Sequence, residues 1–151
     1  MKLIELLVKE QIEPNLKGEN KFQIIEELID RLNSNQQVKN RDQALEDVLA
    51  REGYLSTGLE NGLAIPHAKT DGVDKLVISF GIKRDGVDFE SLDGKPASLI
   101  FLVLSPRDTS GPHIQALATI SRNLKDKTIR EMILKKNTAD EILEYLNQLN
   151  S

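Results

Sequence analysis

The stretch ASLIFLVLSP, residues 97–106, decides the fold that this sequence predicts. It contains an unbroken apolar run, Leu99 to Leu104, without the alternation of apolar and polar side chains that a half-exposed strand shows. A run that is apolar on both faces is typical of a strand that other elements cover from both sides. Pro106 has no amide proton for a sheet hydrogen bond, so we expect the strand to stop there. The sequence therefore predicts a central, buried strand.

A second strand is expected shortly before this one. The stretch KLVISFGIK, residues 75–83, is rich in the β-branched residues that strands favour. Two turn signals separate the two apolar runs: the Asp-Gly pair in RDGV, residues 84–87, and the stretch SLDGKP, residues 91–96. The middle of the chain is therefore expected to be a sheet whose strands are joined by short turns.

Amphipathic helices are predicted before this sheet. Residues 20–33 carry apolar side chains three and four positions apart, at Phe22, Ile25, Ile29 and Leu32. Residues 40–52 repeat the pattern, with Asn40 as the N-cap, Gln43 reaching back to it, Gly53 ending the helix and Arg51 in the last turn. The first residues, MKLIELLVKEQI, predict a short amphipathic helix with one apolar face made of Leu3, Leu6 and Leu7.

Three more helices are predicted after the sheet, over residues 110–124, 127–136 and 138–149. In the first, Pro112 suits a helix start, and the side chains expected to face inward are Ile114, Leu117, Ala118, Ser121 and Leu124. The last opens with a capping box from Thr138 to Glu141. Helices on both sides of a strand-rich middle predict an α/β fold, in which helices cover both faces of one sheet in a single domain. The order of the strands does not follow from these patterns.

Composition excludes several kinds of protein. Lys and Arg number 20 and Asp and Glu number 24, and the resulting net charge of −4 argues against nucleic acid as the main partner. The chain has no cysteine, which excludes disulfides, a thiolate zinc site and a cysteine nucleophile within it and is compatible with the cytoplasm. Glu5 and Lys9 interrupt the first apolar run, so we expect neither a signal peptide nor a membrane span there.

The two histidines of the chain are the candidates for chemistry. His67 follows Pro66 in the stretch ENGLAIPHAK, where we expect the end of a strand to hold the imidazole rigidly and expose it. His113 follows Pro112 in the first turn of a predicted helix, where unpaired backbone N–H groups favour an anion. Both could equally be ordinary polar surface residues.

Other kinds of site have weaker support. The glycines of STGLENGLAIPH are not followed by Gly-Lys-Ser/Thr, so this is no P-loop, and they do not match the dinucleotide fingerprint. A metal-dependent hydrolase would need a third ligand beside the two histidines, and nothing in the sequence marks one. A serine hydrolase would need a GxSxG elbow, which the chain lacks.

Three stretches together resemble a known family: REGYLSTGLENGLAIPHAK (51–69), DFESLDGKPASLIFLVLSP (88–106) and SGPHIQALATISRNLKD (110–126). They are similar to the enzyme IIA domains of the bacterial phosphoenolpyruvate-dependent sugar phosphotransferase system, of the mannitol/fructose type that includes the nitrogen-regulatory branch. The resemblance covers nearly the whole chain, so residues 1–151 are expected to form one such domain, with a mixed β-sheet flanked by helices. It implies that a histidine accepts a phosphoryl group from the histidine-containing phosphocarrier protein and passes it to a cysteine of an enzyme IIB domain.

Residue by residue, the resemblance makes His67 the phosphorylated nucleophile. His113 matches the second histidine, and Arg51 matches the arginine that precedes the STG block. Thr57, Gly58 and Gly62 are expected to support the phosphoryl group, the glycines through backbone N–H groups. No cofactor or metal is expected, because the donor carries a single phosphoryl group rather than a chelated triphosphate. Leu59, Leu63 and Ile65 are near enough in sequence to His67 to contribute an apolar rim for the partner.

Two functions remain open under this resemblance. One is phosphoryl transfer in the uptake of a sugar of the fructose/mannitol type, with the acceptor cysteine on a separate chain because this one has none. The other is a nitrogen-regulatory role, in which the phosphorylation state of His67 controls binding to target proteins. In both, we expect a cytoplasmic protein without direct membrane insertion. The sequence does not reveal the sugar, the oligomeric state or the physiological acceptor.

Overall fold

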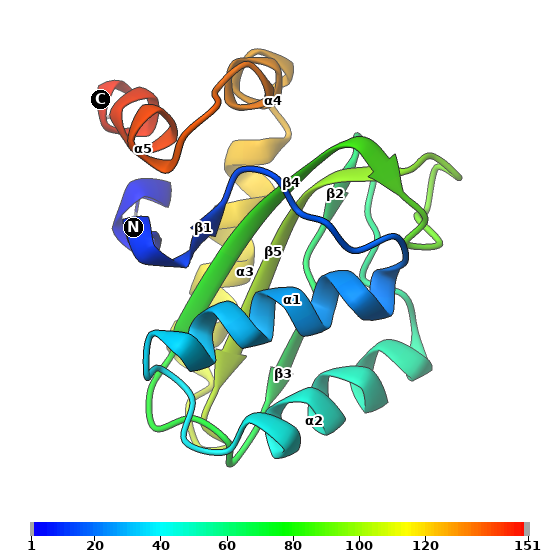
Figure 1. Cartoon of the computed structure of the whole chain (residues 1–151), viewed down its shortest axis with the longest axis vertical. Helices are drawn as coiled ribbons and strands as arrows, with labels where there is room; N and C mark the ends of the chain where they lie inside the picture. Colours follow the sequence, from blue (N-terminus) through cyan, green and yellow to red (C-terminus); the bar gives the residue numbers. More distant parts are fainter. Residues whose placement is uncertain (1, 150–151) are drawn as a thin grey trace.

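The computed structural model describes residues 2–149, and its centre is a mixed β-sheet (Figure 1). The sheet is built from β1 (Ile12–Glu13), β2 (Leu63–Ala64), β3 (His67–Lys69), β4 (Val77–Val87) and β5 (Ala97–Ser105). Its strand order is β1-β4-β5-β2, and β3 also pairs with β5. β4 runs antiparallel to β5, whereas β2 and β3 run parallel to it.

β5 is the central strand that the apolar run predicts. Every residue of β5 except Ser98 is buried, and Pro106 follows directly after its last residue. One edge of β5 pairs with β4, and the other edge is shared by the two short strands β2 and β3. The side chains of Ile100 and Leu102 face one layer of the core, whereas those of Leu99 and Phe101 face the other.

Helices cover both faces of the sheet (Figure 1). On one face, α1 (Lys21–Ser34) and α2 (Arg41–Tyr54) pack their buried apolar side chains against the strands. On the other lie α3 (Gly111–Leu124), α4 (Lys127–Leu134), α5 (Ala139–Gln148) and the N-terminal segment. The predicted fold class, an α/β fold with a mixed sheet flanked by helices on both faces, is confirmed. Within residues 2–149 no helix is both long and apolar enough to cross a lipid bilayer.

The N-terminal segment corrects one expectation. It forms two 3₁₀ turns, η1 (Leu3–Leu6) and η2 (Lys9–Gln11), instead of one amphipathic helix. Lys2, Leu7 and Val8, which flank these turns, all have extended backbone angles, so the segment bends twice. Leu3 and Leu7 are nevertheless buried beneath α3 and α5, because two short turns can seat apolar side chains on a surface as well as one helix can.

The ends of α2 and β4 differ in detail from those that the sequence predicts. Asn40 caps α2 as predicted, but the side chain of Gln43 donates to Asp47 and does not reach back, and the helix continues past Gly53 to Tyr54. The Asp-Gly pair does not make a hairpin turn. β4 continues through it with a shift of register, and Gly86 adopts a φ of +80° there, which suits a bulge. The turn between β4 and β5 lies at the second signal, where the amide of Gly94 donates to the carbonyl of Ser91.

The buried face of α3 also differs from the predicted one. The side chains that face the sheet are His113, Ala116, Thr119, Ile120 and Leu124. Ala118 and Ile114 are exposed instead, and Leu117 and Ser121 border the pocket around His67. The apolar side chains of α3 therefore serve two surfaces, and only one of these is the core.

Candidate functional site

A break in the sheet edge places His67. β2 ends at Ala64, and β3 begins at His67, so both short strands pair with the same edge of β5 and Ile65 and Pro66 lie between them. In this gap the amide of Ile65 donates to the carbonyl of Thr57, and the carbonyl of Pro66 accepts from the amide of Val103. His67 is thus the first residue of a strand, not the residue after one as the sequence suggested. These hydrogen bonds hold the backbone before His67, and the pairing of Ala68 with Leu104 in the sheet holds the backbone after it.

The tautomer of His67 follows from its backbone contact. Its Nδ1 lies 2.8 Å from the carbonyl oxygen of Ile65. A carbonyl can only accept, so Nδ1 carries the proton and Nε2 keeps a free lone pair. Burial lowers the pKa of His67 below its ordinary value, and the contact with Ile65 offsets part of that effect. At neutral pH the ring is therefore neutral, with a nucleophilic nitrogen at Nε2.

His113 lies beside this ring. It sits in the first turn of α3, and the centroids of the two imidazoles are 5.6 Å apart with the rings inclined at 62°. The side chain is buried, and its Nδ1 lies 2.7 Å from the hydroxyl oxygen of Ser105. Burial, followed by the electrostatic interactions with the titratable ring of His67 and with the charge of Lys69, lowers the pKa of His113 to about 4. A neutral imidazole here can offer a hydrogen bond to a group that is bound to His67.

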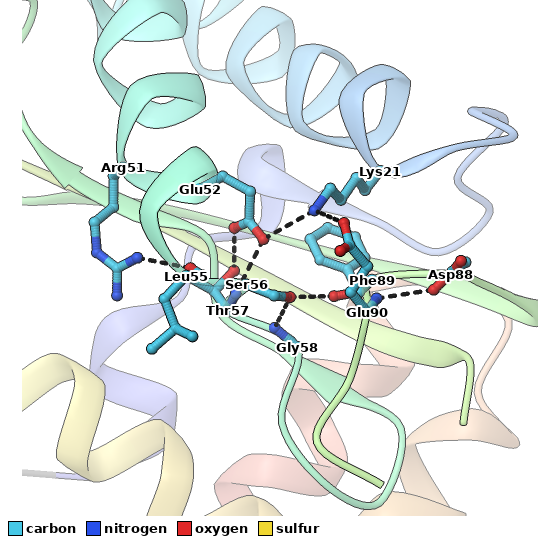
Figure 2. A network of polar contacts seen from close by, with 10 residues as sticks. All are labelled: Lys21, Arg51, Glu52, Leu55, Ser56, Thr57, Gly58, Asp88, Phe89 and Glu90. Atoms are coloured by element: carbon cyan, nitrogen blue, oxygen red, sulfur yellow. Dashed lines mark hydrogen bonds and ion pairs between the residues drawn. The ribbon is translucent and has the colours of Figure 1, made fainter. Parts of the chain in front are cut away.

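Arg51 approaches the same place from the last turn of α2. Its guanidinium lines the pocket around His67, and Nη1 donates to the carbonyl of Leu55 at 2.8 Å (Figure 2). That contact uses one of the five N–H donors of the group. A planar cation with several donors is suited to the oxygens of a phosphoryl group. The structure therefore brings together His67, His113 and Arg51, which lie far apart in the sequence.

A buried carboxylate braces the loop between Arg51 and His67 (Figure 2). Glu52 accepts two hydrogen bonds from Thr57, one from the amide at 3.0 Å and one from the hydroxyl at 2.6 Å. Lys21 neutralises it at 3.4 Å and also contacts Glu90 at 2.5 Å. Burial would lower the pKa of Lys21, but its contacts with Glu90 and Glu52 outweigh this effect and raise it, so the amine stays charged.

This network changes the role of Thr57. Its side chain is buried and its hydroxyl donates its one proton to Glu52, so in this structure that proton is not offered to a phosphoryl group. Its backbone carbonyl accepts from the amide of Ile65, whose own carbonyl holds the ring of His67. Thr57 therefore supports His67 indirectly, through a chain of hydrogen bonds that begins at Glu52.

The two glycines expected to bind phosphoryl oxygens do not have amides placed for it. The amide of Gly58 donates to the hydroxyl of Ser56. Leu63, which follows Gly62, pairs with Leu99, whereas His67 pairs with Val103 four positions further along β5. At about 3.3 Å per residue, Gly62 is therefore more than ~13 Å from His67 along the strand. Gly62 serves the turn between Asn61 and Leu63, where its φ is +77°.

Gly58 is needed for a close approach instead. A Cβ atom at this position would lie 2.6 Å from the carbonyl oxygen of Phe89 and 2.7 Å from the hydroxyl of Ser91. Any side chain there would push the loop away from residues 89–91. Glycine at this position therefore keeps the loop that borders the His67 pocket close to the body of the protein.

The apolar rim of the pocket differs from the expected one. Leu63 and Ile65 are buried in the core, and only Leu59 of the three expected side chains is partly accessible beside the pocket. The exposed apolar side chains are instead Leu55, at 67% exposure, and Leu92, at 73%. Both line the pocket around His67: Leu55 directly follows α2, and Leu92 lies between β4 and β5. Ile114, which follows His113 in the sequence, is 64% exposed.

Sequence reasoning missed three polar residues of this site. Glu52 lies beside Arg51 in the sequence. Its position at the end of the apolar face of a helix could have indicated a buried carboxylate with a polar partner. Lys69 is two positions after His67 and so shares its side of the strand, where its Nζ donates to Ser110 at the start of α3. Ser105 ends the apolar run of β5 and had no recognisable signal. Among residues 2–149, no group of three or more His, Cys, Asp or Glu side chains is placed to hold a metal ion.

We expect Glu52→Ala to lower the free energy of unfolding by about 3 kcal/mol, because it leaves Lys21 short of a buried counter-charge and Thr57 without an acceptor. Urea denaturation followed by circular dichroism measures this. The matched control is Asp74→Ala, which breaks an exposed pair with Lys39 and should leave the free energy of unfolding almost unchanged. Equal losses in the two variants would show that the Glu52 network does not stabilise the loop.

Comparisons with known proteins match nearly the whole chain. The family model described as "Phosphoenolpyruvate-dependent sugar phosphotransferase system, EIIA 2" matches residues 5–149. A fructose-specific EIIABC component of the phosphotransferase system from Bacillus subtilis is 38% identical over 148 residues, which are 98% of this chain. The chain spans only 23% of the length of that relative.

Two further relatives are similar over most of their own length. A fructose-specific EIIA component from Haloferax volcanii is 40% identical over 83% of this chain and 81% of that protein. The crystal structure of nitrogen regulatory protein IIA-Ntr from Neisseria meningitidis superimposes with a TM-score of 0.82, is 31% identical, and covers 95% of this chain and 98% of that one.

Proposed function

This chain belongs to the EIIA 2 family of the phosphoenolpyruvate-dependent sugar phosphotransferase system, and on that premise we propose that His67 is the residue that carries the phosphoryl group. The family is one of phosphotransferases, and we further propose that residues 1–151 form one such domain. The observation that carries the assignment is the contact of His67 Nδ1 with the carbonyl of Ile65, which leaves Nε2 as a nucleophile in a pocket shared with Arg51.

The proposed transfer is a single displacement at phosphorus. The lone pair of His67 Nε2 forms a bond to the phosphorus of a phosphohistidine on the donor, and the bond from that phosphorus to the donor imidazole breaks. The electron pair of the broken bond stays on the donor nitrogen, and the ring of His67 gains positive charge. The carbonyl of Ile65 stabilises this charge through Nδ1–H.

Positioning and charge stabilisation are the main contributions a protein can make to such a loose transition state. In this site, Arg51 is the cation next to the phosphoryl oxygens, and His113 offers a neutral N–H donor. No step needs a metal ion, because Arg51 supplies a positive charge and His113 supplies a hydrogen-bond donor. A second displacement passes the phosphoryl group on: a thiolate of the acceptor forms a bond to phosphorus, the bond from phosphorus to His67 Nε2 breaks, and its electron pair returns to Nε2.

The donor that we propose is the histidine-containing phosphocarrier protein, and the acceptor is a cysteine of an enzyme IIB domain. A cytoplasmic location belongs to the same proposal. The fructose-specific names of two relatives support a sugar of the fructose type. Incubation with enzyme I, the phosphocarrier protein and labelled phosphoenolpyruvate, followed by addition of candidate IIB domains, tests the donor and the acceptor separately.

A regulatory role is the second candidate, and the likeness to IIA-Ntr from Neisseria meningitidis favours it. In that case the phosphorylation state of His67 would govern binding to target proteins, and no IIB cysteine would accept the label. Genes for IIB and IIC components beside this one would favour transport, whereas neighbouring nitrogen-regulation genes would favour regulation.

We expect Leu92→Asp to reduce phosphoryl transfer from the phosphocarrier about tenfold at low donor concentration. A charge on the exposed rim of the pocket would weaken a small, transient contact that depends on apolar side chains. Initial rates at several donor concentrations measure this, and saturating donor should restore most of the loss. The control is Val8→Asp, an exposed valine outside the His67 pocket. Equal rates for both variants would exclude Leu92 from the docking surface.

A further inference from the structure

The end of β5 contributes a buried hydroxyl to the second histidine. Ser105 is the last residue of the strand and has no exposed surface. Its Oγ lies 2.7 Å from Nδ1 of His113, in the first turn of α3. Because Ser105 pairs with Lys69 in the sheet, the strand that holds His67 also fixes the position of this hydroxyl. One rigid element thus connects the two histidines.

A count of protons settles the direction of this hydrogen bond. Neutral imidazole has one N–H, and the serine has one O–H. If His113 carried its proton on Nδ1, it would donate to Ser105, and the buried hydroxyl proton would need another acceptor. Within residues 2–149, His113 is the sole hydrogen-bond partner of Ser105 Oγ. A buried O–H without a partner is costly, so the hydroxyl donates to Nδ1 and the imidazole proton sits on Nε2.

We propose that Ser105 is a positioning residue for phosphoryl transfer, which holds the proton of His113 on Nε2 and the ring in the orientation that presents this proton to the phosphoryl group on His67. The inference rests on the proposed function of His67. The two rings then have complementary roles. His67 donates through Nδ1 to a carbonyl and offers a lone pair at Nε2, whereas His113 accepts at Nδ1 and offers a proton at Nε2.

The tautomer of His113 is important because the ring is neutral. A doubly protonated imidazolium could donate from either nitrogen, and no hydroxyl would be needed to choose between them. Burial and the electrostatic interactions with the titratable ring of His67 and with the charge of Lys69 lower the pKa of His113 to about 4, so the ring has a single proton at neutral pH. The placement of that proton therefore decides whether His113 can act as a donor to the phosphoryl group.

The first test reads the tautomer directly in the full wild-type chain. With ¹⁵N-labelled histidine, long-range proton–nitrogen correlation spectra distinguish protonated from unprotonated ring nitrogens. We expect Nδ1 of His113 to be unprotonated and Nε2 protonated, with the reverse pattern in His67. A proton on Nδ1 of His113 would overturn the proposal. This result does not depend on phosphorylation, so it stands apart from a failure of His67 to accept label.

The second test asks whether Ser105 acts through His113. We expect Ser105→Ala to lower the maximal rate of His67 phosphorylation about tenfold, without changing the donor concentration for half-maximal rate, because Ser105 is buried away from the docking surface. Ser105→Thr, which keeps the hydroxyl, should restore most of the rate. In the background of His113→Ala, adding Ser105→Ala should cause no further loss. A wild-type rate in Ser105→Ala, or an equal additional loss in the double variant, would overturn the proposal.

Discussion

His67→Ala is expected to abolish phosphorylation of this protein, with no label above background when the chain is incubated with enzyme I, the phosphocarrier protein and labelled phosphoenolpyruvate. The expectation follows from geometry: His67 has a neutral ring, a lone pair at Nε2 and a backbone that is hydrogen-bonded on both sides. No other described side chain combines these features, because Nδ1 of His113 is paired with Ser105 and its Nε2 carries the proton. The wild-type label should be acid-labile, as a phosphoramidate is.

The position of the label provides the control. In His113→Ala the label should still appear on His67, more slowly, and nuclear magnetic resonance of the labelled wild type should place phosphorus on Nε2. Circular dichroism must show that His67→Ala is folded, which we expect because the ring is only partly buried. Full labelling of His67→Ala, or label on Nδ1, would contradict the assignment of His67 as the nucleophile.

Substitution of His113 is expected to slow the transfer in a defined order. His113→Ala removes the N–H donor from the site, and the loss of one donor from a charged transition state typically costs ~10²–10³ in rate. His113→Gln keeps an N–H₂ group at similar reach, so its rate should lie between those of wild type and His113→Ala. Single-turnover measurements with phosphorylated phosphocarrier in excess report this step, with His67 the labelled residue in every variant.

Stability must be measured alongside these rates. His113 is 6% exposed and satisfies the hydroxyl of Ser105, so His113→Ala leaves a small cavity and an unpaired buried O–H. We expect a loss of about 1–3 kcal/mol from the free energy of unfolding, and the assays belong at a temperature where all variants are folded. Equal rates for wild type, His113→Gln and His113→Ala would remove His113 from the reaction and leave Arg51 as the stabilising group.

The sequence predicted an element correctly where its apolar side chains all pack into the core. The run from Leu99 to Leu104 predicts a strand covered on both faces, and the structure places it at the centre of the sheet. The buried face of α3 was predicted wrongly because some of its apolar side chains pack in the core and others do not. Ile114 is exposed and Leu117 borders the pocket, and periodicity does not distinguish a side chain that packs on a sheet from one that faces a pocket.

The sequence motifs of the family identified the histidines and the arginine of the candidate site. His67, His113 and Arg51 were named from the family resemblance. The fold places Arg51 in the lining of the pocket around His67, and the ring of His113 lies 5.6 Å from the ring of His67, centroid to centroid. Gly62 was misjudged because closeness in sequence was taken for closeness in space, although an extended chain carries the two residues apart. Glu52 and Ser105 were missed because their importance depends on partners contributed by other elements, namely Thr57, Lys21 and His113.

The contact between Arg51 and the carbonyl of Leu55 has an energetic consequence for a protein that must release what it accepts. If the guanidinium turns to a phosphoryl group on His67 and releases this carbonyl, it gives up one hydrogen bond as it makes others, so the net gain is smaller than the new contacts alone would give. A smaller net gain would make the phosphoryl group easier to pass on. Release of the Leu55 carbonyl would also change the backbone beside the exposed Leu55 side chain, at the rim where a partner would bind.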